Sequence, residues 1–585
     1  MTKFRCTVCN WVYDESKQKK KFSSLPDSYI CPVCGAPKSA FVPLSKITQK
    51  TSTNVADKIV KQLEAFNVKH IYGIPGESNL PIIDAIRRSK IKFILTRHEE
   101  TAAFMASAHG KITDSLGVCI SIAGPGSTNL ITGLVDAATD RSPVLALAGQ
   151  IPEIYLGSEA FQEIDQIELF QSFTEFAETI SKPNQALKLT KTAIKNAYKK
   201  PGVSVLSTPT DILTENLPEK IFKPEIFQNP TFSNKNIKKA AQLINNSNKI
   251  TILAGWGARH SSKLLLQLSQ KLKAPIATTS RAKGVINETY KYSLGVLGSI
   301  GSIYAAKSIA DSDLIIIIGS GFRQANLVPP NMKIIQIDND SLKIGKTFNV
   351  DAGLLGDSDL ILQKLVPLIS NKQENKKFIE NINKYKQEHL NEIEKESKDF
   401  STPINPGFVI QALKNNINKN AIICVDVGDH TFWFYKKFIC EGQKTFMSAN
   451  MASMAFSLPA SLSAQLDFPN KQVICITGDG GFGMLMADFT TAVREKLPIK
   501  VILFNDEKLK NIKKEQIRDG YPEFGVSFPN PNFAEFAKSC GGDGYRVINP
   551  KNLNNILKKA FQSKKPTIVE IMIDPNKMIR GVKKV

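Results

Sequence analysis

Two cysteine pairs close to the start of the chain have the spacing of a metal site. Cys6 and Cys9 form one Cys-x2-Cys pair, Cys31 and Cys34 form another, and 21 residues lie between the pairs. Each pair presents two sulfur atoms from one tight turn, so together they predict a tetrahedral four-thiolate site for iron or zinc. Gly35 can take the positive φ that such a turn requires. A zinc ribbon that stabilises its own fold or binds nucleic acid is the alternative to an iron centre.

A second group of chemically active residues follows a predicted strand at residues 472–477. Residues 478–483 have the sequence GDGGFG, which is formally the G-x-G-x-x-G turn of a dinucleotide site, so NAD binding is one interpretation. Asp479 disfavours NAD, because its carboxylate would lie against the pyrophosphate and repel it. A divalent cation removes this conflict. Asp479 and Asp506, each at a strand end, are oxygen ligands of the kind that Mg2+ prefers.

Glu99 is a third candidate, because it follows a predicted strand at residues 91–96 and opens a helix of small residues. Taken alone, the run from Arg97 to Glu100 is the first turn of a helix with carboxylates near the positive end of the helix dipole. A functional role for Glu99 therefore depends on what the rest of the chain resembles.

Three series of alternating strands and helices must position these residues. The pattern predicts α/β domains with parallel sheets at residues 53–215, 236–372 and 403–585, after a small metal-binding unit at residues 1–44. Such sheets bind ligands at the carboxyl ends of their strands. The predicted strands are 70–73, 91–96, 117–123, 143–149, 202–207, 250–254, 275–278, 314–319, 333–338, 421–426, 472–477, 499–505 and 567–573, and the clearest predicted helices are 55–66 and 373–398.

The composition of the 585-residue chain excludes several classes of protein. Hydrophobic residues make up 42% and charged residues 22%, which excludes a wholly disordered chain. The longest apolar runs are far shorter than the ~20 residues of a membrane span, and residues 1–15 lack the apolar stretch of a secretory signal. The net charge of +22 comes mostly from dispersed lysines, which is typical of a solvated surface. We therefore predict a cytoplasmic protein with no membrane partner and no nucleic-acid partner.

The first 44 residues resemble rubredoxin in the shortened form that occurs as a fused module. The resemblance rests on the runs CTVCNWVYDE and LPDSYICPVCGAPKSAF, which contain both cysteine pairs. It implies one iron held by the four cysteines and transfer of single electrons. Asn10 stands where most rubredoxins have glycine, which is a mild departure.

From Thr53 onward the chain resembles the pyruvate oxidase and acetolactate synthase group of thiamine-diphosphate enzymes. The pair formed by Gly478-Asp479-Gly480 and Asn505-Asp506, 27 residues apart, is the signature of enzymes that use this cofactor. The resemblance implies three α/β domains, thiamine diphosphate, Mg2+ and a 2-oxoacid substrate. The other matching motifs are Gly73-Ile74-Pro75-Gly76, Arg97-His98-Glu99, Gly124-Pro125-Gly126, Asp140-Arg141-Ser142-Pro143-Val144-Leu145 and Phe161-Gln162-Glu163.

The resemblance also implies a role for each matching residue. Glu99 becomes the glutamate that activates the cofactor through N1′ of its aminopyrimidine. Phe161, Gln162 and Glu515 are expected near the substrate. The other implied site residues are Ile512, Val427 and Met454, which hold the bent cofactor, Gly76, Gly124, Pro125, Gly126, Gly478, Gly480 and Gly481, which contact it, and Asp479, Asp506 and the Lys508 carbonyl, which bind magnesium.

Two positions depart from the family pattern. Met454-Ala455-Phe456-Ser457-Leu458-Pro459 stands where family members usually have Met-Gly-x-Gly-x-Pro, and we expect this change to narrow the space around the pyrimidine ring. Lys510 replaces a glycine that is usual near the thiazolium ring, which leaves the substrate specificity open.

The branch of the group is suggested by residues 515–526, which look more like a pyruvate oxidase. Pyruvate oxidases also bind FAD in their central domain. Gly255, Arg259 and Asp338 lie where that flavin would bind, although any α/β domain can have such turns. Oxidation of the substrate releases two electrons and a single iron accepts one at a time, so a flavin between them resolves the mismatch.

These observations predict oxidative decarboxylation of a 2-oxoacid, pyruvate, with thiamine diphosphate, Mg2+, FAD and a rubredoxin-type iron centre. The expected electron acceptor is a redox partner protein or O2, and the expected assembly is a homodimer or homotetramer. One alternative is an acetolactate synthase-like carboligase with a structural or regulatory metal module. An alternative of another class is a zinc-ribbon nucleic-acid-binding protein.

Overall fold

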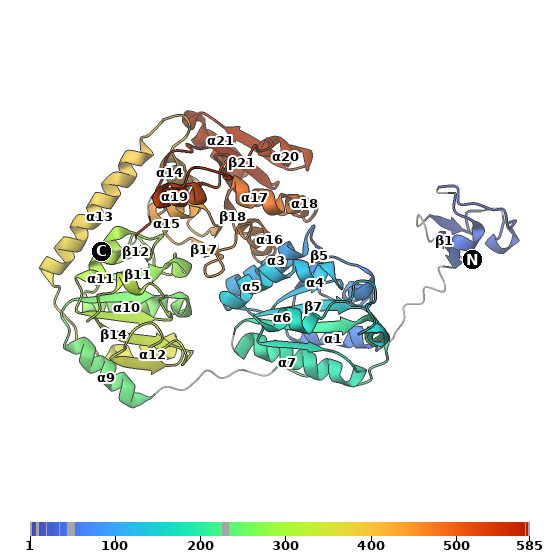
Figure 1. The fold of residues 1–585 in the computed structure, drawn as a ribbon, viewed down its shortest axis with the longest axis horizontal. Helices are drawn as coiled ribbons and strands as arrows, with labels where there is room; N and C mark the ends of the chain where they lie inside the picture. The colour runs from blue at the N-terminus through green and yellow to red at the C-terminus, as the bar shows by residue number, and fades with distance from the viewer. Residues whose placement is uncertain are drawn as a thin grey trace.

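The structure, a computed structural model, describes residues 3–6, 11–18, 20–33, 35–43, 53–199, 201–224, 233–579 and 581–582. These residues form a small N-terminal unit with a three-stranded antiparallel sheet and three larger units, each with a six-stranded parallel sheet (Figure 1). The predicted fold class is therefore confirmed.

The strands of each sheet are given in their spatial order. The small sheet has the order β2 (Val12–Asp14), β1 (Lys3–Cys6) and β3 (Phe41–Pro43). The first large sheet has β5 (Lys92–Leu95), β4 (His70–Gly73), β6 (Gly117–Ser121), β7 (Val144–Gln150), β9 (Val203–Pro209) and β8 (Phe176–Thr179). The central sheet has β12 (Ser293–Leu297), β11 (Ile276–Thr279), β10 (Ile250–Ala254), β13 (Leu314–Ile318), β14 (Lys333–Asp338) and β15 (Ala352–Leu355). The third large sheet has β17 (Lys444–Met447), β16 (Ile422–Val425), β18 (Val473–Gly478), β19 (Lys500–Asn505), β21 (Thr567–Met572) and β20 (Asp543–Val547).

The helices alternate with these strands along the chain. The first domain contains α1 (Val55–Ala65), α2 (Leu80–Arg87), α3 (Glu99–Thr113), α4 (Pro125–Asn129), α5 (Ile131–Thr139), α6 (Gln166–Gln171), α7 (Ala186–Lys199) and α8 (Thr210–Thr214). The central domain contains α9 (Asn234–Asn245), α10 (Ser262–Leu272), α11 (Ile303–Ala310) and α12 (Ser358–Leu365), and is followed by the long α13 (Lys376–Ser397). The third domain contains α14 (Pro406–Asn416), α15 (Asp429–Lys437), α16 (Ser457–Asp467), α17 (Asp479–Leu485), α18 (Phe489–Arg494), α19 (Lys510–Asp519), α20 (Phe533–Ser539) and α21 (Leu553–Gln562).

The first and third sheets have the same topology, and the central sheet differs. Numbered within each domain, their strands follow the order 2-1-3-4-6-5, whereas the central strands follow 3-2-1-4-5-6. The order reverses beside the first strand in every sheet, between β4 and β6, β10 and β13, and β16 and β18. Ligand sites are expected at these three reversals.

Helix α3 joins the first and third domains because its small residues allow close packing. Ala102, Ala103 and Ala106 are fully buried, and one continuous apolar core contains residues from both domains. The rings of Phe104 on α3 and Phe456, just before α16, lie 5.8 Å apart in an edge-to-face contact. Figure 1 shows α3 and α16 where the two domains meet. Within the described part of the chain, no helix combines the length and apolarity needed to cross a membrane.

Candidate active site

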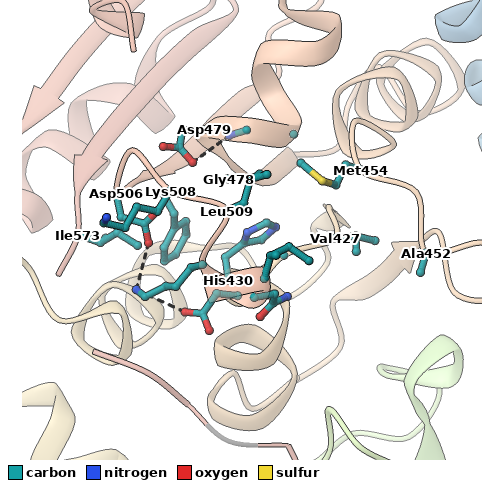
Figure 2. A pocket seen from close by; sticks show the side chains of 18 residues that line it. Val427, His430, Ala452, Met454, Gly478, Asp479, Asp506, Lys508, Leu509 and Ile573 are labelled. Atoms are coloured by element: carbon teal, nitrogen blue, oxygen red, sulfur yellow. Dashed lines mark hydrogen bonds and ion pairs between the residues drawn. The ribbon is translucent and has the colours of Figure 1, made fainter. Parts of the chain in front are cut away.

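A cavity of about 200 Å³ lies at the carboxyl ends of β16 and β18, where the strand order of the third sheet reverses (Figure 2). All residues predicted for the site from the third domain line this cavity except Glu515, which is exposed on α19. The lining residues are Val427, Gly428, Asp429, His430, Ala452, Met454, Gly478, Asp479, Gly480, Gly481, Phe504, Asp506, Lys508, Leu509, Lys510, Asn511, Ile512 and Ile573.

Asp479 begins α17 directly after β18, so its carboxylate is fixed at the end of the strand. Its Oδ1 accepts a hydrogen bond from the Gly480 N–H (2.9 Å), and its Oδ2 accepts from the Glu507 N–H (2.7 Å) and the Asn530 amide (2.8 Å). Burial and the nearby Asp506 carboxylate raise the pKa of Asp479 to about 6. Two neighbouring buried carboxylates are stabilised by a cation, so this pair could hold a divalent ion.

A lysine cation is held among the acids of the same cavity. Lys510 Nζ lies 3.1 Å from Asp506 Oδ2 and 3.6 Å from Asp429 Oδ2, and it donates a hydrogen bond to the Asp574 carbonyl (2.7 Å). Burial raises the pKa of Asp506, while Lys510 opposes that shift. Lys510 therefore supplies a positive charge next to Asp506.

His430 is a buried histidine of the cavity wall. It is 5% exposed, and its Nε2 has no hydrogen-bond partner among the described residues. Burial lowers the pKa of His430 to about 4, so the ring is neutral at pH 7. A Cβ at Gly428 would lie 2.7 Å from the ring, and one at Gly478 would lie 3.1 Å from it, so both glycines leave room for the imidazole.

Asp426 packs against the glycine-rich turn on the side away from the cavity. It is fully buried at the end of β16 and accepts hydrogen bonds from the Val427 N–H (2.9 Å) and the Thr477 hydroxyl (2.9 Å). Burial raises the pKa of Asp426 to about 6. A Cβ at Gly481 would lie 2.5 Å from its Oδ2, so only glycine fits there.

Glu99 lies in the first domain, at the equivalent reversal between β4 and β6. It starts α3, is 6% exposed, and accepts a hydrogen bond from the Asn129 amide (3.0 Å). A Cβ at Gly126 would lie 3.2 Å from Glu99 Oε1. The turn of Gly124, Pro125 and Gly126 thus lies directly beside the Glu99 carboxylate, and a larger residue at position 126 would crowd it.

Two further predicted residues lie beside this turn. Gly124 has φ +59°, and a Cβ there would lie 3.0 Å from the Gln162 carbonyl oxygen. Gly76 has even less room, because a Cβ there would lie 2.4 Å from the Ile122 side chain. Phe161, next to Gln162, has an 87% exposed side chain.

Within one chain, the structure does not bring these two groups of residues together in the cavity. No lining residue of the cavity belongs to the first domain. Phe456, which occupies the variable position of the Met-Gly-x-Gly-x-Pro motif, does not line the cavity but is fully buried against Phe104. Ala455 takes the left-handed conformation (φ +71°), which favours glycine, so this departure from the motif has a backbone cost.

The central sheet has a glycine crossing at its own reversal. Gly255 follows β10 and Gly319 follows β13, and a Cβ at Gly255 would lie 2.4 Å from the Gly319 carbonyl oxygen. Asp338 ends β14 and is 8% exposed. Arg259 donates from Nε to Asp114 of the first domain (3.1 Å), so its charge is already paired in this structure.

The two cysteines of the small N-terminal unit that the structure describes are both buried. Cys6 is fully buried, Cys31 is 2% exposed, and both belong to a core of aromatic side chains. The turns that carry them are closed by backbone hydrogen bonds from Cys6 to Trp11 (2.8 Å) and from Cys31 to Ala36 (2.7 Å). Cys9 and Cys34, the other predicted ligands, lie outside the described residues.

Comparison with protein families identifies all four units. The models that match are the N-terminal TPP binding domain of thiamine pyrophosphate enzymes at residues 53–169, the central domain at 237–365 and the C-terminal TPP binding domain at 426–571. A rubredoxin model matches residues 3–41. The chain belongs to the thiamine pyrophosphate enzyme family.

Relatives of this thiamine pyrophosphate enzyme cover nearly the same length. The chain is 38% identical to YdaP of Bacillus subtilis (strain 168), which is named as a thiamine pyrophosphate-containing protein, over 87% of this chain and 90% of the relative. It is 29% identical to a pyruvate oxidase of Lactiplantibacillus plantarum (90% and 90%) and 28% identical to an acetolactate synthase large subunit of Pyropia yezoensis (89% and 91%). The chain is therefore an enzyme of the pyruvate oxidase and acetolactate synthase group with a fused rubredoxin domain.

The cavity of this thiamine pyrophosphate enzyme suits an anionic cofactor bound through a cation. Gly478, Gly480 and Gly481 keep side chains away from the end of β18, while Asp479 and Asp506 supply carboxylate oxygens. A Cβ at Gly480 would lie 3.2 Å from Leu509 and 3.3 Å from Met454, so the glycine turn and these side chains form one continuous wall. The donor set fits a diphosphate and a hard divalent ion.

Sequence reasoning missed several residues of the site. Asn530 connects Asp479 to Asn505, whose Oδ1 accepts its second hydrogen bond (3.0 Å), yet no motif surrounds it. Asp426 and His430 flank the predicted contact Val427. A signal for them existed, because polar residues directly after a buried strand are expected to face the ligand site.

Proposed function

We propose that the chain catalyses the oxidative decarboxylation of a 2-oxoacid, pyruvate, and passes the electrons through FAD to its rubredoxin-type iron. The observation that carries this proposal is the rubredoxin domain fused to the N-terminal, central and C-terminal domains of a thiamine pyrophosphate enzyme. A carboligase forms and breaks C–C bonds without net oxidation, so it has no electrons to deliver to such a domain.

The residues of the cavity bind and orient the cofactor. Asp479, Asp506 and the Lys508 carbonyl hold Mg2+, which offsets the repulsion between the carboxylates and the diphosphate. When bound, thiamine diphosphate supplies the nucleophilic carbon that C–C cleavage requires. Val427, Met454 and Ile512 shape the wall against which the rings rest.

Glu99 holds a proton at N1′ of the aminopyrimidine. Its burial and the single amide contact from Asn129 suit a carboxyl group that must exchange a hydrogen bond with a ring nitrogen rather than with water. Phe161, Gln162 and Glu515 contribute to the substrate side. The exposed side chain of Phe161 is available to contact a neighbouring surface.

The site is completed by a second copy of the chain, in a homodimer or homotetramer. Support comes from the cavity lining, which includes only third-domain residues, while Glu99 and Gln162 belong to the first domain. Apposing the first domain of one subunit to the third domain of another brings the two groups together. We infer a cytoplasmic enzyme that acts without a membrane or nucleic-acid partner.

FAD binds the central domain in this proposal. The strand order 3-2-1-4-5-6 is that of dinucleotide-binding sheets, and the close backbone packing of Gly255 on Gly319 lies at the strand-order reversal, where such sheets bind their ligands. A flavin accepts two electrons and releases them singly, which matches an iron that accepts one at a time. The final acceptor is a redox partner protein or O2.

The second candidate is an acetolactate synthase-like carboligase whose metal module is structural or regulatory. Acetolactate synthase relatives that align with about nine-tenths of the chain favour it. The two candidates differ in what the purified protein contains. Ferric-thiolate and flavin absorption bands with about one iron per chain support the oxidative enzyme, whereas colourless protein or flavin bands with zinc support the carboligase.

A further inference from the structure

A cluster of two histidines and one aspartate lies at the junction of the first and third domains, outside the cofactor cavity. His70 begins β4, His109 lies on α3, and Asp467 is the last residue of α16. The strand, the first helix and the second helix are distant in sequence, but α3 and α16 pack together in the shared core (Figure 1). None of the three residues has a role in the proposed reaction.

The ligand atoms of these residues converge on one point. His109 Nδ1 lies 2.8 Å from Asp467 Oδ2, and His70 Nδ1 lies 3.7 Å from Asp467 Oδ1. One ligand atom from each residue lies within 4.8 Å of both others. In a tetrahedral zinc site with bonds of about 2.0 Å, ligand atoms lie about 3.3 Å apart, so only a small movement of His70 closes the set.

Packing and hydrogen bonding within the described residues do not account for the buried polar side chain of His70. Its Nδ1 is buried and has no hydrogen-bond partner among the described residues. The imidazole lies roughly parallel to the ring of the fully buried Tyr72, with ring centroids 6.3 Å apart. The neighbouring Lys92 is paired with Glu495 (2.7 Å), so its charge is largely compensated. A buried polar atom without a partner is costly, and a metal ion would satisfy it.

We propose that His70, His109 and Asp467 bind a zinc ion that clamps the first domain to the third. Two imidazole nitrogens and one carboxylate oxygen are a zinc ligand set, and water completes the tetrahedron. Zinc binding replaces the His109–Asp467 hydrogen bond. Each histidine binds zinc through an unprotonated Nδ1 and keeps its one proton on Nε2, so an imidazole that was protonated on both nitrogens releases one proton. Because the ligands come from both domains, zinc stabilises only the arrangement in which α3 and α16 are packed.

The test uses the full chain with its thiolate site already filled and with thiamine diphosphate and Mg2+ present. Zinc is titrated into wild type, His70→Gln and the control His260→Gln, whose histidine is exposed and lies outside the cluster. We expect wild type and the control to bind one more zinc per chain than His70→Gln, or His70→Gln to bind it at least tenfold more weakly. Zinc also raises the apparent Tm of wild type by about 2–5 °C and leaves that of His70→Gln unchanged.

Equal zinc binding by wild type and His70→Gln would overturn the proposal. Cobalt added to wild type alone gives a second test that does not depend on the variant folding. We expect weak visible bands without sulfur charge-transfer absorption, as nitrogen and oxygen ligands produce. No cobalt uptake, or bands of thiolate type only, would equally contradict the site.

Discussion

The first and third domains have the same strand order, yet different side chains lie where the strand order of each sheet reverses. In the third domain, Asp426, Asp479 and His430 are buried and their pKa values are displaced by that burial. In the first domain, the same position holds a glycine turn and a single carboxylate, Glu99, bound to a neutral amide. Topology therefore decides where a site forms, and the loop residues decide what it binds.

This difference assigns separate tasks to the two domains. The third domain concentrates carboxylates that need a cation, as a binding site for Mg2+ and a diphosphate would. The first domain presents one buried carboxylate, Glu99, against a turn that admits no side chain, and we propose that this group handles a proton. The predictions below change one region at a time and ask whether binding and proton transfer separate as this division requires.

The largest effect is expected from Glu99→Gln. An amide cannot hold the proton at N1′, so turnover should fall about 10²–10⁴-fold while cofactor binding stays nearly unchanged. Glu100→Gln changes the adjacent carboxylate and serves as the matched control. Hydrogen–deuterium exchange at C2 of the bound cofactor measures the step directly, and an exchange rate equal to that of wild type would remove Glu99 from its role.

Asp479→Ala should weaken the binding of Mg2+ and the cofactor rather than the proton transfer that Glu99→Gln affects. Loss of one buried carboxylate ligand should raise the Mg2+ and cofactor concentrations needed for half-saturation about 100-fold. The exposed Asp519→Ala controls for the loss of a negative charge. Titration of cofactor against each variant gives the result. A change in NAD affinity instead would revive the dinucleotide interpretation of the glycine turn.

His430 should make the third domain sensitive to acid. Its folded-state pKa of about 4 lies below the unfolded value of about 6.5, so its contribution is present above pH 6.5 and is lost as the pH falls toward 4. The shift corresponds to about 3 kcal/mol. As the pH falls from 6.5 to 4, the free energy of unfolding of His430→Gln should therefore decrease less than that of wild type. Urea midpoints measured from pH 7 to 4 test this, and parallel curves for the two proteins would contradict it.

Deleting residues 1–43 is expected to have the smallest effect on decarboxylation of pyruvate and reduction of the flavin. The rubredoxin domain has its own aromatic core and its own metal ligands, so its loss should not disturb the three larger domains. Flavin reduction by pyruvate should proceed at the wild-type rate, while reduction of one-electron acceptors is lost. Slower flavin reduction in the truncated chain would show that the domain supports the active site in another way.

Much of the fold could be predicted because buried parallel strands give continuous apolar runs. Every strand of the large sheets that the sequence analysis missed, namely β8, β12, β15, β17 and β20, lies at the edge of its sheet. An edge strand has a neighbour on one side only, and β8 has no fully buried residue, so its apolar pattern is weak. Strands β12 and β17 are mostly buried, and their short runs include polar residues or glycine that interrupt the apolar pattern.

The acids and glycines at the strand ends could be predicted for the same reason, since each directly follows an apolar run. Asn530, Lys510 with Asp429, and the packing of Phe456 on Phe104 could not, because each depends on segments that only the folded chain brings together.

Anaerobic stopped-flow mixing of the enzyme with pyruvate tests the central claim most directly. Absorption of the flavin and of the ferric-thiolate centre is followed together, and the products are analysed for acetolactate. The oxidative enzyme predicts that the flavin bands bleach first and the iron bands follow, with acetate or an acetyl derivative as product. Accumulation of acetolactate while the iron remains ferric would contradict the account and identify the carboligase.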